Sequence, residues 1–209
     1  MNNPLQQTAQ WFSDRAGCLT ASRVRDILPG KTGKYLKSRA DLLDDIVAER
    51  VTGRARDGFT TAAMQWGIDH EDEARSAYVA RNFDPVELVG FVRHPDIPYF
   101  GASPDGLVGD DGLIEIKCPS TTTHLRYVRA GVVPEEYRPQ ILTQLICTGR
   151  KWCDFVSYDP RIQERWENLR FFCIRWEPAQ DEKDALLAAC RRFLAEVDAE
   201  MEKLLCKPE

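Results

Sequence analysis

The 209-residue chain has little of what zinc sites and disulfide frameworks require. It contains only three histidines, and none of its seven cysteines forms a Cys-x-x-Cys pair. Zinc sites usually draw on such closely spaced pairs, and an odd number of cysteines does not suit a disulfide framework. We therefore expect the cysteines to be buried, reduced and structural.

The sequence also lacks a membrane-spanning segment and a secretory signal. No stretch approaches the roughly 20 apolar residues that cross a bilayer, and the N-terminal residues contain neither a basic region nor an apolar run. No repeat or low-complexity segment is present. With 43% hydrophobic and 29% charged residues, the chain is expected to form a single globular domain over residues 1–209 in the cytoplasm.

The net charge of −5 argues against a protein that coats nucleic acid without specificity. The charge is unevenly distributed, because residues 15–39 carry seven bases and one acid, whereas residues 177–209 carry nine acids and five bases. A polyanion would be attracted to the first region and repelled by the second. This polarity suits an enzyme that admits DNA at one side, although charge runs more often form plain solvated faces.

Hydrophobic periodicity and turn residues predict helices interrupted by a mostly antiparallel run of strands. The helices are expected near residues 20–28, 38–52, 62–82, 120–130, 134–148 and 180–205, and the strands near residues 87–93, 99–102, 106–109, 113–118, 152–158 and 167–176. This order predicts an α/β or α+β fold with a central sheet flanked by helices.

The most informative segment, residues 103–118, contains charge where a buried strand is predicted. Asp105 lies in a turn rich in Gly and Pro, while Glu115 and Lys117 share one strand face and Ile114, Ile116 and Cys118 share the other. Apolar residues on both faces predict a covered strand, in which charge is costly unless it is paired or bound to metal. Mg²⁺ prefers such carboxylate ligands. The alternative is a turn stabilised by Asp105 and a solvated Glu115–Lys117 pair.

Two further helices contain unexpected polar residues. Glu71 shares a helix face with small or apolar residues, which favours either a metal site beneath the sheet or an ion pair with Arg75 one turn later. Gln140 and Gln144 share a face of the helix predicted at 134–148. Amides that face a core indicate hydrogen bonds to a bound group or to the backbone.

The start of the helix predicted at 20–28 is a candidate phosphate site. Thr20 is a plausible N-cap, and Ser22 lies in the first turn with Arg15 nearby. Backbone N–H groups at a helix N-terminus attract anions. Simple capping by Thr20 is the alternative.

Six motifs, in order along residues 15–161, resemble those of the lambda-exonuclease (YqaJ) branch of the PD-(D/E)XK nucleases. They are Arg15-Ala16-Gly17-Cys18-Leu19-Thr20-Ala21-Ser22, Trp66-Gly67 with Glu71-Asp72-Glu73-Ala74-Arg75, Ser103-Pro104-Asp105-Gly106-Leu107, Glu115-Ile116-Lys117-Cys118-Pro119, Tyr137 with Gln140, and Tyr158-Asp159-Pro160-Arg161. Residues 177–209 match only as a terminal helix. The resemblance implies a restriction-endonuclease-like mixed sheet flanked by helices.

The resemblance also implies a Mg²⁺-dependent 5′→3′ exonuclease, with Mn²⁺ as a substitute. It would digest one strand of linear double-stranded DNA from a 5′-phosphorylated end to mononucleotides, leaving a 3′ overhang. The implied metal ligands are Asp105, Glu115, Glu71 and the Ile116 carbonyl. Lys117 would orient and help deprotonate the attacking water, with Gln140 beside the catalytic group. The implied 5′-phosphate pocket is Arg15, Ser22, Ser103 and Gln140.

Other roles implied by the resemblance concern DNA and partners. Met64 occupies the place of an apolar wedge that parts the terminal base pairs, with a core role as the alternative. Lys31 or Lys34 is the candidate contact to the downstream duplex. A homotrimeric ring and a single-strand annealing protein are the expected partners, in the cytoplasm of a bacterial host with a phage or prophage gene.

Three other functions stay open on the residues alone. A PD-(D/E)XK endonuclease would use the same core, and a metal-dependent hydrolase of small phosphate esters would need a closed pocket. A non-catalytic protein that binds DNA ends would need a broken active site, whereas every expected catalytic position is filled. The iron–sulfur branch of related nucleases is disfavoured because its four-cysteine cluster is missing.

Overall fold

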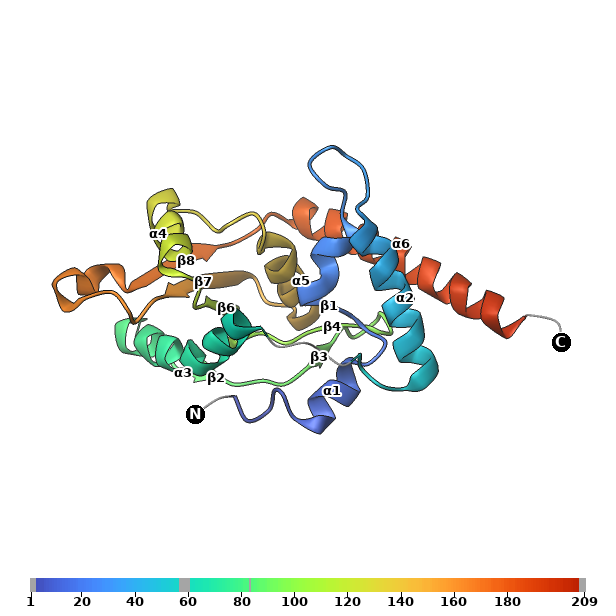
Figure 1. The fold of residues 1–209 in the computed structure, drawn as a ribbon, viewed down its shortest axis with the longest axis horizontal. Helices are drawn as coiled ribbons and strands as arrows, with labels where there is room; N and C mark the ends of the chain where they lie inside the picture. The colour runs from blue at the N-terminus through green and yellow to red at the C-terminus, as the bar shows by residue number, and fades with distance from the viewer. Residues whose placement is uncertain (1–2, 57–60, 83, 207–209) are drawn as a thin grey trace.

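The computed structural model describes residues 3–56, 61–82 and 84–206 and contains two sheets (Figure 1). The larger sheet has the order β2-β5-β6-β7-β8, and its strands are Val86–Glu87, Gly106–Val108, Gly112–Lys117, Trp152–Tyr158 and Phe171–Trp176. The strands β6 and β7 are parallel and the other pairs are antiparallel. The smaller sheet has the order β1-β4-β3, with strands Leu19–Thr20, Phe100–Ala102 and Val92–Arg93.

The helical elements surround these sheets. The α-helices α1 to α6 are Ala9–Arg15, Lys37–Thr52, Ala62–Asn82, Thr121–Ala130, Arg138–Thr148 and Gln180–Leu205, and the 3₁₀ helices η1 and η2 are Ala21–Ile27 and Glu164–Leu169. A mixed sheet flanked by helices confirms the predicted α/β fold. Among the described residues, no helix is long and apolar enough to cross a membrane.

The strand β6 is covered on both faces, as its sequence predicted. Ile114 and Ile116 pack against Ala74 and Tyr78 of α3. On the opposite face, Leu113 lies in a second cluster with residues of α4, α5 and β7. Figure 1 shows α3 and α4 on opposite sides of this sheet. Side chains that alternate along β6 therefore reach two different layers.

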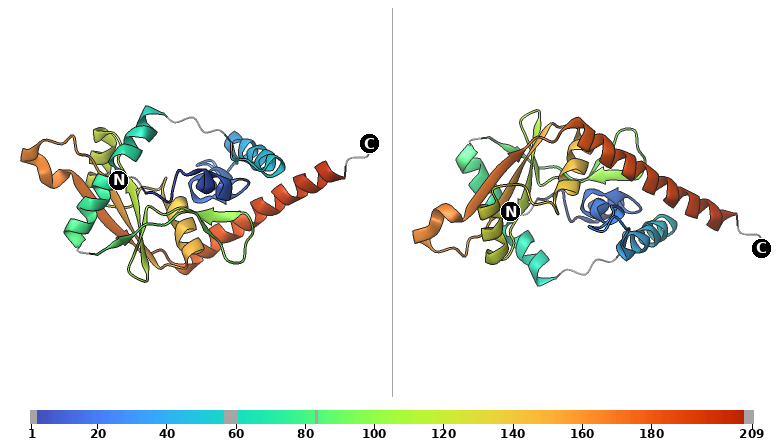
Figure 2. Two further views of the ribbon diagram at one scale, coloured as in Figure 1. Left: turned by 90° about the horizontal axis from the view of Figure 1, so that it is seen from below. Right: turned by 90° about the horizontal axis from the view of Figure 1, so that it is seen from above.

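The helix α5 contributes to two separate hydrophobic cores. Ile141 and Leu145 belong to the cluster beneath β6, whereas Leu142 and Cys147 belong to a separate core with η1, α2 and α6. The helix α6 contributes buried residues up to Val197 and then extends away from the other elements (Figure 2). A residue on α5 can therefore face the central sheet while its helix packs against η1.

Several predicted boundaries were wrong at the N-terminal half. The helix α1 was not predicted, because seven residues with no buried side chain carry little periodic signal. The helix predicted at 20–28 is the 3₁₀ helix η1, and Thr20 pairs with Gly101 in a parallel strand and makes no capping bond with its side chain. The strand predicted at 87–93 is two short strands, β2 and β3.

Two element boundaries in the C-terminal half differ from the predicted ones, and two of the cysteines are not buried as expected. The helix predicted at 134–148 begins at Arg138, where Pro139 occupies the first turn and is tolerated without its N–H. The 3₁₀ helix η2 precedes β8 in the strand predicted at 167–176. All seven cysteines are free and five are buried, but Cys173 is half-buried and Cys206 is exposed.

Candidate active site

Glu115 is the centre of the polar cluster and has no solvent exposure. It lies on β6 and faces α5, where Gln140 and Gln144 each donate a 2.6 Å hydrogen bond to a different carboxylate oxygen. Lys117, two residues along the same strand face, places Nζ 2.5 Å from Oε1 of Glu115. The Lys117 ammonium also lies 5.0 Å from the centre of the Tyr137 ring. The buried carboxylate is thus fully surrounded by donors.

Asp105 enters the cluster from the turn between β4 and β5. Its Oδ2 accepts a 2.6 Å hydrogen bond from the backbone N–H of Ile116. The strand β5 pairs with β6 only over Gly112–Ile114, so the Asp105 side chain takes the position that a further strand residue would occupy. The sheet register therefore brings Asp105 beside the Glu115–Lys117 edge of β6. Because β6 is a central strand and Glu115 is fully buried, the alternative of a solvated pair on an edge strand is wrong.

Glu71 and Arg75 extend the cluster from α3. Arg75 pairs with Glu71, as one sequence-based alternative predicted, and also with Asp72 at 3.1 Å. The Arg75 side chain is only 7% exposed, and its Nε donates a 3.3 Å hydrogen bond to the backbone carbonyl of Asp105. The ion-pair alternative is therefore confirmed, and Arg75 links Glu71 to the backbone of Asp105. The metal site beneath the sheet stays a prediction.

The carboxylates act on one another electrostatically. Burial, together with the negative charges of Glu115 and Glu71, holds the pKa of Asp105 well above its usual value. Burial and Glu115 likewise raise the pKa of Glu71, against the opposing effects of Arg75 and Lys117. Burial alone would lower the pKa of Lys117, but Glu115 and Asp105 outweigh it and raise the pKa. The cluster therefore holds more negative charge than its cations balance.

The donor types fit a hard divalent cation. Carboxylate and carbonyl oxygens are the ligands that Mg²⁺ prefers, and a cation would relieve the repulsion felt by Asp105. Within residues 3–56, 61–82 and 84–206, however, no three His, Cys, Asp or Glu side chains are arranged as a complete metal site. Glu115 and Glu71 are instead occupied by their amide and arginine partners. When a cation binds, these amide and arginine partners would have to release a carboxylate oxygen of Glu115 or Glu71.

Part of the predicted phosphate pocket is assembled beside this cluster. Arg15 at the end of α1 donates a 3.3 Å hydrogen bond to Oγ of Ser103, two residues before Asp105. Trp11 donates to the same oxygen at 2.9 Å and lies under the Arg15 guanidinium, 4.0 Å from its carbon to the ring centre. Burial, followed by the charge of Arg23, lowers the pKa of Arg15 to about 10, so it remains cationic at neutral pH.

Ser22 and Gln140 are not in contact with Arg15 and Ser103 in the described part of the chain. Ser22 is exposed and its Oγ lies 3.3 Å from the hydroxyl of Thr20, whereas the Gln140 amide is bound to Glu115. Their elements do meet, because α5 packs against η1. The structure therefore brings together Arg15 and Ser103. The complete four-residue phosphate pocket stays a prediction.

Met64 lies in the first turn of α3 and is 57% exposed. The alternative of a core role for this side chain is therefore wrong. Its expected role in strand separation remains a prediction.

Two residues of the cluster and one beside it were not identified as site residues from the sequence. Gln144 was noted only for sharing a face with Gln140, and its position one turn along α5 was the available signal. Arg75 was considered only as a partner of Glu71. Trp11 carried no signal, because it reaches Ser103 across 92 residues of sequence from a helix that was not predicted.

Comparison with known proteins places this geometry in a family. Residues 10–151 match the model of the YqaJ-like viral recombinase domain, a span that includes every catalytic and phosphate candidate. The chain belongs to the YqaJ-like viral recombinase family. The lambda-exonuclease-like resemblance seen in the sequence is thereby confirmed.

Solved structures agree with the YqaJ-like assignment. An alkaline exonuclease from Laribacter hongkongensis, LHK-Exo, is 43% identical, with a TM-score of 0.86 over 94% of this chain and 96% of that one. The same values hold for LHK-Exo in complex with dAMP. A phage-related exonuclease from Haemophilus somnus 129PT shares the fold, with a TM-score of 0.59, 11% identity and coverage of 88% and 96%. Comparison with the curated proteins gives no match.

Both similarities support an exodeoxyribonuclease, the enzyme class that the sequence predicted. Nucleases of the YqaJ-like kind generally depend on a divalent metal, in agreement with the oxygen-rich donor set around Asp105. The polar cluster on β6 is therefore the candidate active site of a YqaJ-like nuclease.

Proposed function

We propose that this chain is a Mg²⁺-dependent 5′→3′ exonuclease that digests one strand of linear double-stranded DNA from a 5′-phosphorylated end. Its products are mononucleotides and a duplex with a 3′ single-stranded overhang. The nuclease domain comprises residues 1–209. LHK-Exo, the relative that is 43% identical, has been obtained in complex with dAMP, and a mononucleotide of this kind is the expected product.

The observation that carries the proposal is the contact between Arg15 and Ser103. A guanidinium and a hydroxyl that share a hydrogen bond can both donate to a phosphate, and Ser103 precedes Asp105 by two residues. A phosphate bound by Ser103 would therefore be held close to the proposed catalytic carboxylate of Asp105. Recognition of a terminal phosphate beside the cleavage site is what distinguishes an exonuclease from an endonuclease with the same core.

The residues of the cluster have distinct roles in this proposal. Asp105, Glu115, Glu71 and the Ile116 carbonyl would hold the metal, which when bound polarises the phosphoryl group and activates water. Lys117 orients the water and helps to deprotonate it, and its positive charge stabilises the charge that develops on the phosphoryl oxygens. Gln140, bound to Glu115, positions that carboxylate and completes the phosphate pocket with Ser22. Mn²⁺ is expected to substitute for Mg²⁺.

The proposal extends to partners and to the DNA duplex. We expect a homotrimeric ring around the DNA and cooperation with a single-strand annealing protein in recombination, in the cytoplasm of a bacterial host. Met64 would part the terminal base pairs, since its exposed position leaves it free to contact DNA. Lys31 or Lys34 would contact the downstream duplex.

The test uses a linear duplex with different labels on each end of each strand. With Mg²⁺, the account predicts release of the 5′-terminal label as a mononucleotide before any 3′-terminal label is lost, and faster digestion from phosphorylated than from hydroxyl ends. Release of internal fragments from circular DNA would support the endonuclease instead. Equal rates at phosphorylated and hydroxyl ends would refute the phosphate pocket.

A further inference from the structure

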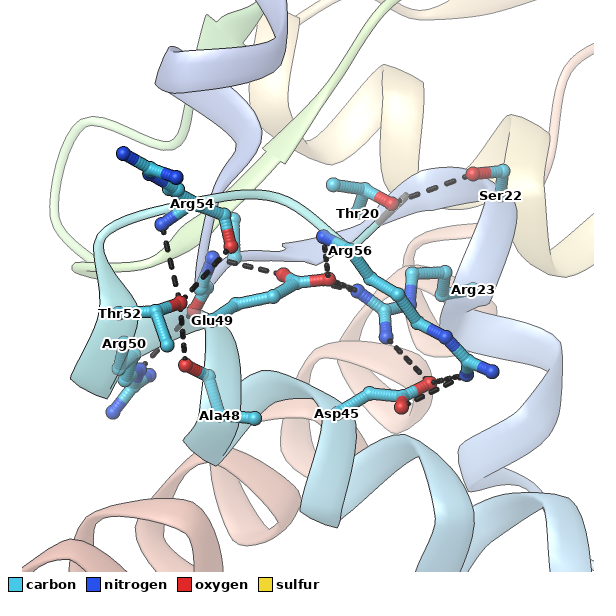
Figure 3. A network of polar contacts seen from close by, with 12 residues as sticks. Thr20, Ser22, Arg23, Asp45, Ala48, Glu49, Arg50, Thr52, Arg54 and Arg56 are labelled. Atoms are coloured by element: carbon cyan, nitrogen blue, oxygen red, sulfur yellow. Dashed lines mark hydrogen bonds and ion pairs between the residues drawn. The ribbon is translucent and has the colours of Figure 1, made fainter. Parts of the chain in front are cut away.

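Glu49, a buried carboxylate outside the catalytic cluster, contacts the segment that joins Arg15 to Ser22. It lies in the last turn of α2 and is only 5% exposed. Its Oε2 accepts a 2.9 Å hydrogen bond from the backbone N–H of Gly17, and its Oε1 accepts one of 3.1 Å from Arg23. Figure 3 shows Glu49 and Arg23 at the centre of this network. A buried carboxylate is stable only with such donors.

Arg50, the next residue of α2, binds the backbone carbonyl of the same glycine. Its Nε donates a 3.1 Å hydrogen bond to the Gly17 carbonyl. The Arg50 side chain is 7% exposed, pairs with Asp198 of α6 at 2.6 Å and lies over the Tyr99 ring at 4.1 Å. The N–H and the carbonyl of Gly17 are therefore both bound by consecutive residues of a helix that is itself anchored.

Gly17 is suited to this close approach. Its φ of +71° lies in the left-handed region, which side chains with a Cβ rarely adopt. A Cβ at this position would come within 2.6 Å of Cγ of Arg50. The turn and the end of α2 therefore fit together only with glycine at this position.

We propose that Glu49 is a positioning residue for recognition of the 5′-phosphorylated DNA end, an inference that rests on the proposed function. Gly17 follows Arg15 by two residues and precedes Ser22 by five. Fixing Gly17 against α2 fixes the separation and direction of these two phosphate donors. Arg23, on the same 3₁₀ helix as Ser22, donates to both oxygens of Glu49, at 3.1 and 3.3 Å, and pairs with Asp45 at 3.5 Å. One carboxylate thus holds both sides of the phosphate-binding segment.

The test compares Glu49→Gln with Asp41→Asn, which removes an exposed charge two turns earlier on α2, where Asp41 pairs with Lys37. A glutamine carries no charge and has an NH₂ donor in place of one acceptor oxygen, so it cannot keep all the bonds that Glu49 accepts from Gly17 and Arg23. The preference for 5′-phosphate over 5′-hydroxyl duplexes is measured as the factor by which the phosphate lowers Kd in EDTA. It is measured again as the factor by which the phosphate raises kcat/KM in Mg²⁺, and each factor is the ratio compared between variants. We expect Glu49→Gln to lower this ratio about tenfold, the effect of one charge-assisted hydrogen bond, mainly through Kd and KM. The Asp41→Asn ratio should stay within about twofold, because its ion pair with Lys37 is exposed.

The role of Glu49 is overturned if folded Glu49→Gln keeps the wild-type ratio. This includes the case in which the variant binds phosphorylated and hydroxyl ends more weakly by the same factor, as a merely structural residue would cause. If Glu49→Gln does not fold, Arg50→Lys takes its place, because it releases the Gly17 carbonyl and keeps a cation beside Asp198. An unchanged ratio in Arg50→Lys would likewise overturn the role. Absence of any preference in the wild-type protein would refute the proposed function itself.

Discussion

Gln140 and Lys117 donate to the same oxygen of Glu115, at 2.6 and 2.5 Å. An amide of α5 and an ammonium of β6 therefore meet on one carboxylate atom. This shared atom connects β6 to the helix that packs against η1. The position of Glu115 thus depends on both elements.

Replacing Lys117 by alanine is expected to reduce the cleavage rate about 10²–10⁴-fold, because the site loses its group for proton transfer and charge stabilisation. Glu115 would keep its two amide partners, so the fold should survive. Single-turnover digestion of 5′-phosphorylated duplex measures the loss, and circular dichroism checks the fold. Lys151→Ala removes an exposed lysine paired with Asp111 and serves as the control. A folded, fully active Lys117→Ala protein would refute this role.

Replacing Gln144 by leucine is expected to lower the free energy of unfolding by about 1–3 kcal/mol, because a buried charge loses a hydrogen-bond donor. Both Gln144 and Glu115 are fully buried, so water cannot easily replace the amide. Urea unfolding measures the change. Gln180→Leu, at an exposed amide paired with Asp184, should have a much smaller effect. Equal stability of Gln144→Leu and wild type would contradict the assigned contact.

Replacing Met64 by alanine is expected to change the free energy of unfolding by less than about 0.5 kcal/mol, as is usual at exposed positions. If the side chain parts the terminal base pairs, digestion should start more slowly on fully paired ends, with little change on ends that carry unpaired terminal nucleotides. Initial rates on the two substrates provide the comparison. The same slowing on both substrates would argue against strand separation by Met64.

The sequence was sufficient for the parts of the site that depend on local periodicity. The alternation of Glu115 and Lys117 with Ile114 and Ile116 predicted a covered β6, and both faces are buried as expected. The same kind of reasoning identified the Glu71–Arg75 pair, whose members lie one helical turn apart. In each case, neighbours in sequence determine neighbours in space.

Contacts between distant segments could not be predicted in this way. Arg15 meets Ser103 across 88 residues, and Glu49 meets Gly17 across 32. These contacts depend on how α1 and α2 pack, which no periodic pattern specifies. The resemblance to a nuclease family suggested Arg15 and Ser103 together, but it gave no role to Glu49. Long-range packing therefore accounts for the positioning residues that the sequence left out.

The most direct test of the catalytic cluster is digestion of a 5′-phosphorylated linear duplex by wild-type protein and by Asp105→Asn. The variant keeps an acceptor oxygen for the Ile116 N–H but loses the negative charge that would hold the metal. In Mg²⁺, the wild-type protein should release mononucleotides, and EDTA should stop the reaction. Asp105→Asn should bind the duplex and release none. Digestion by a folded Asp105→Asn protein at the wild-type rate would contradict the assignment of this cluster as the nuclease site.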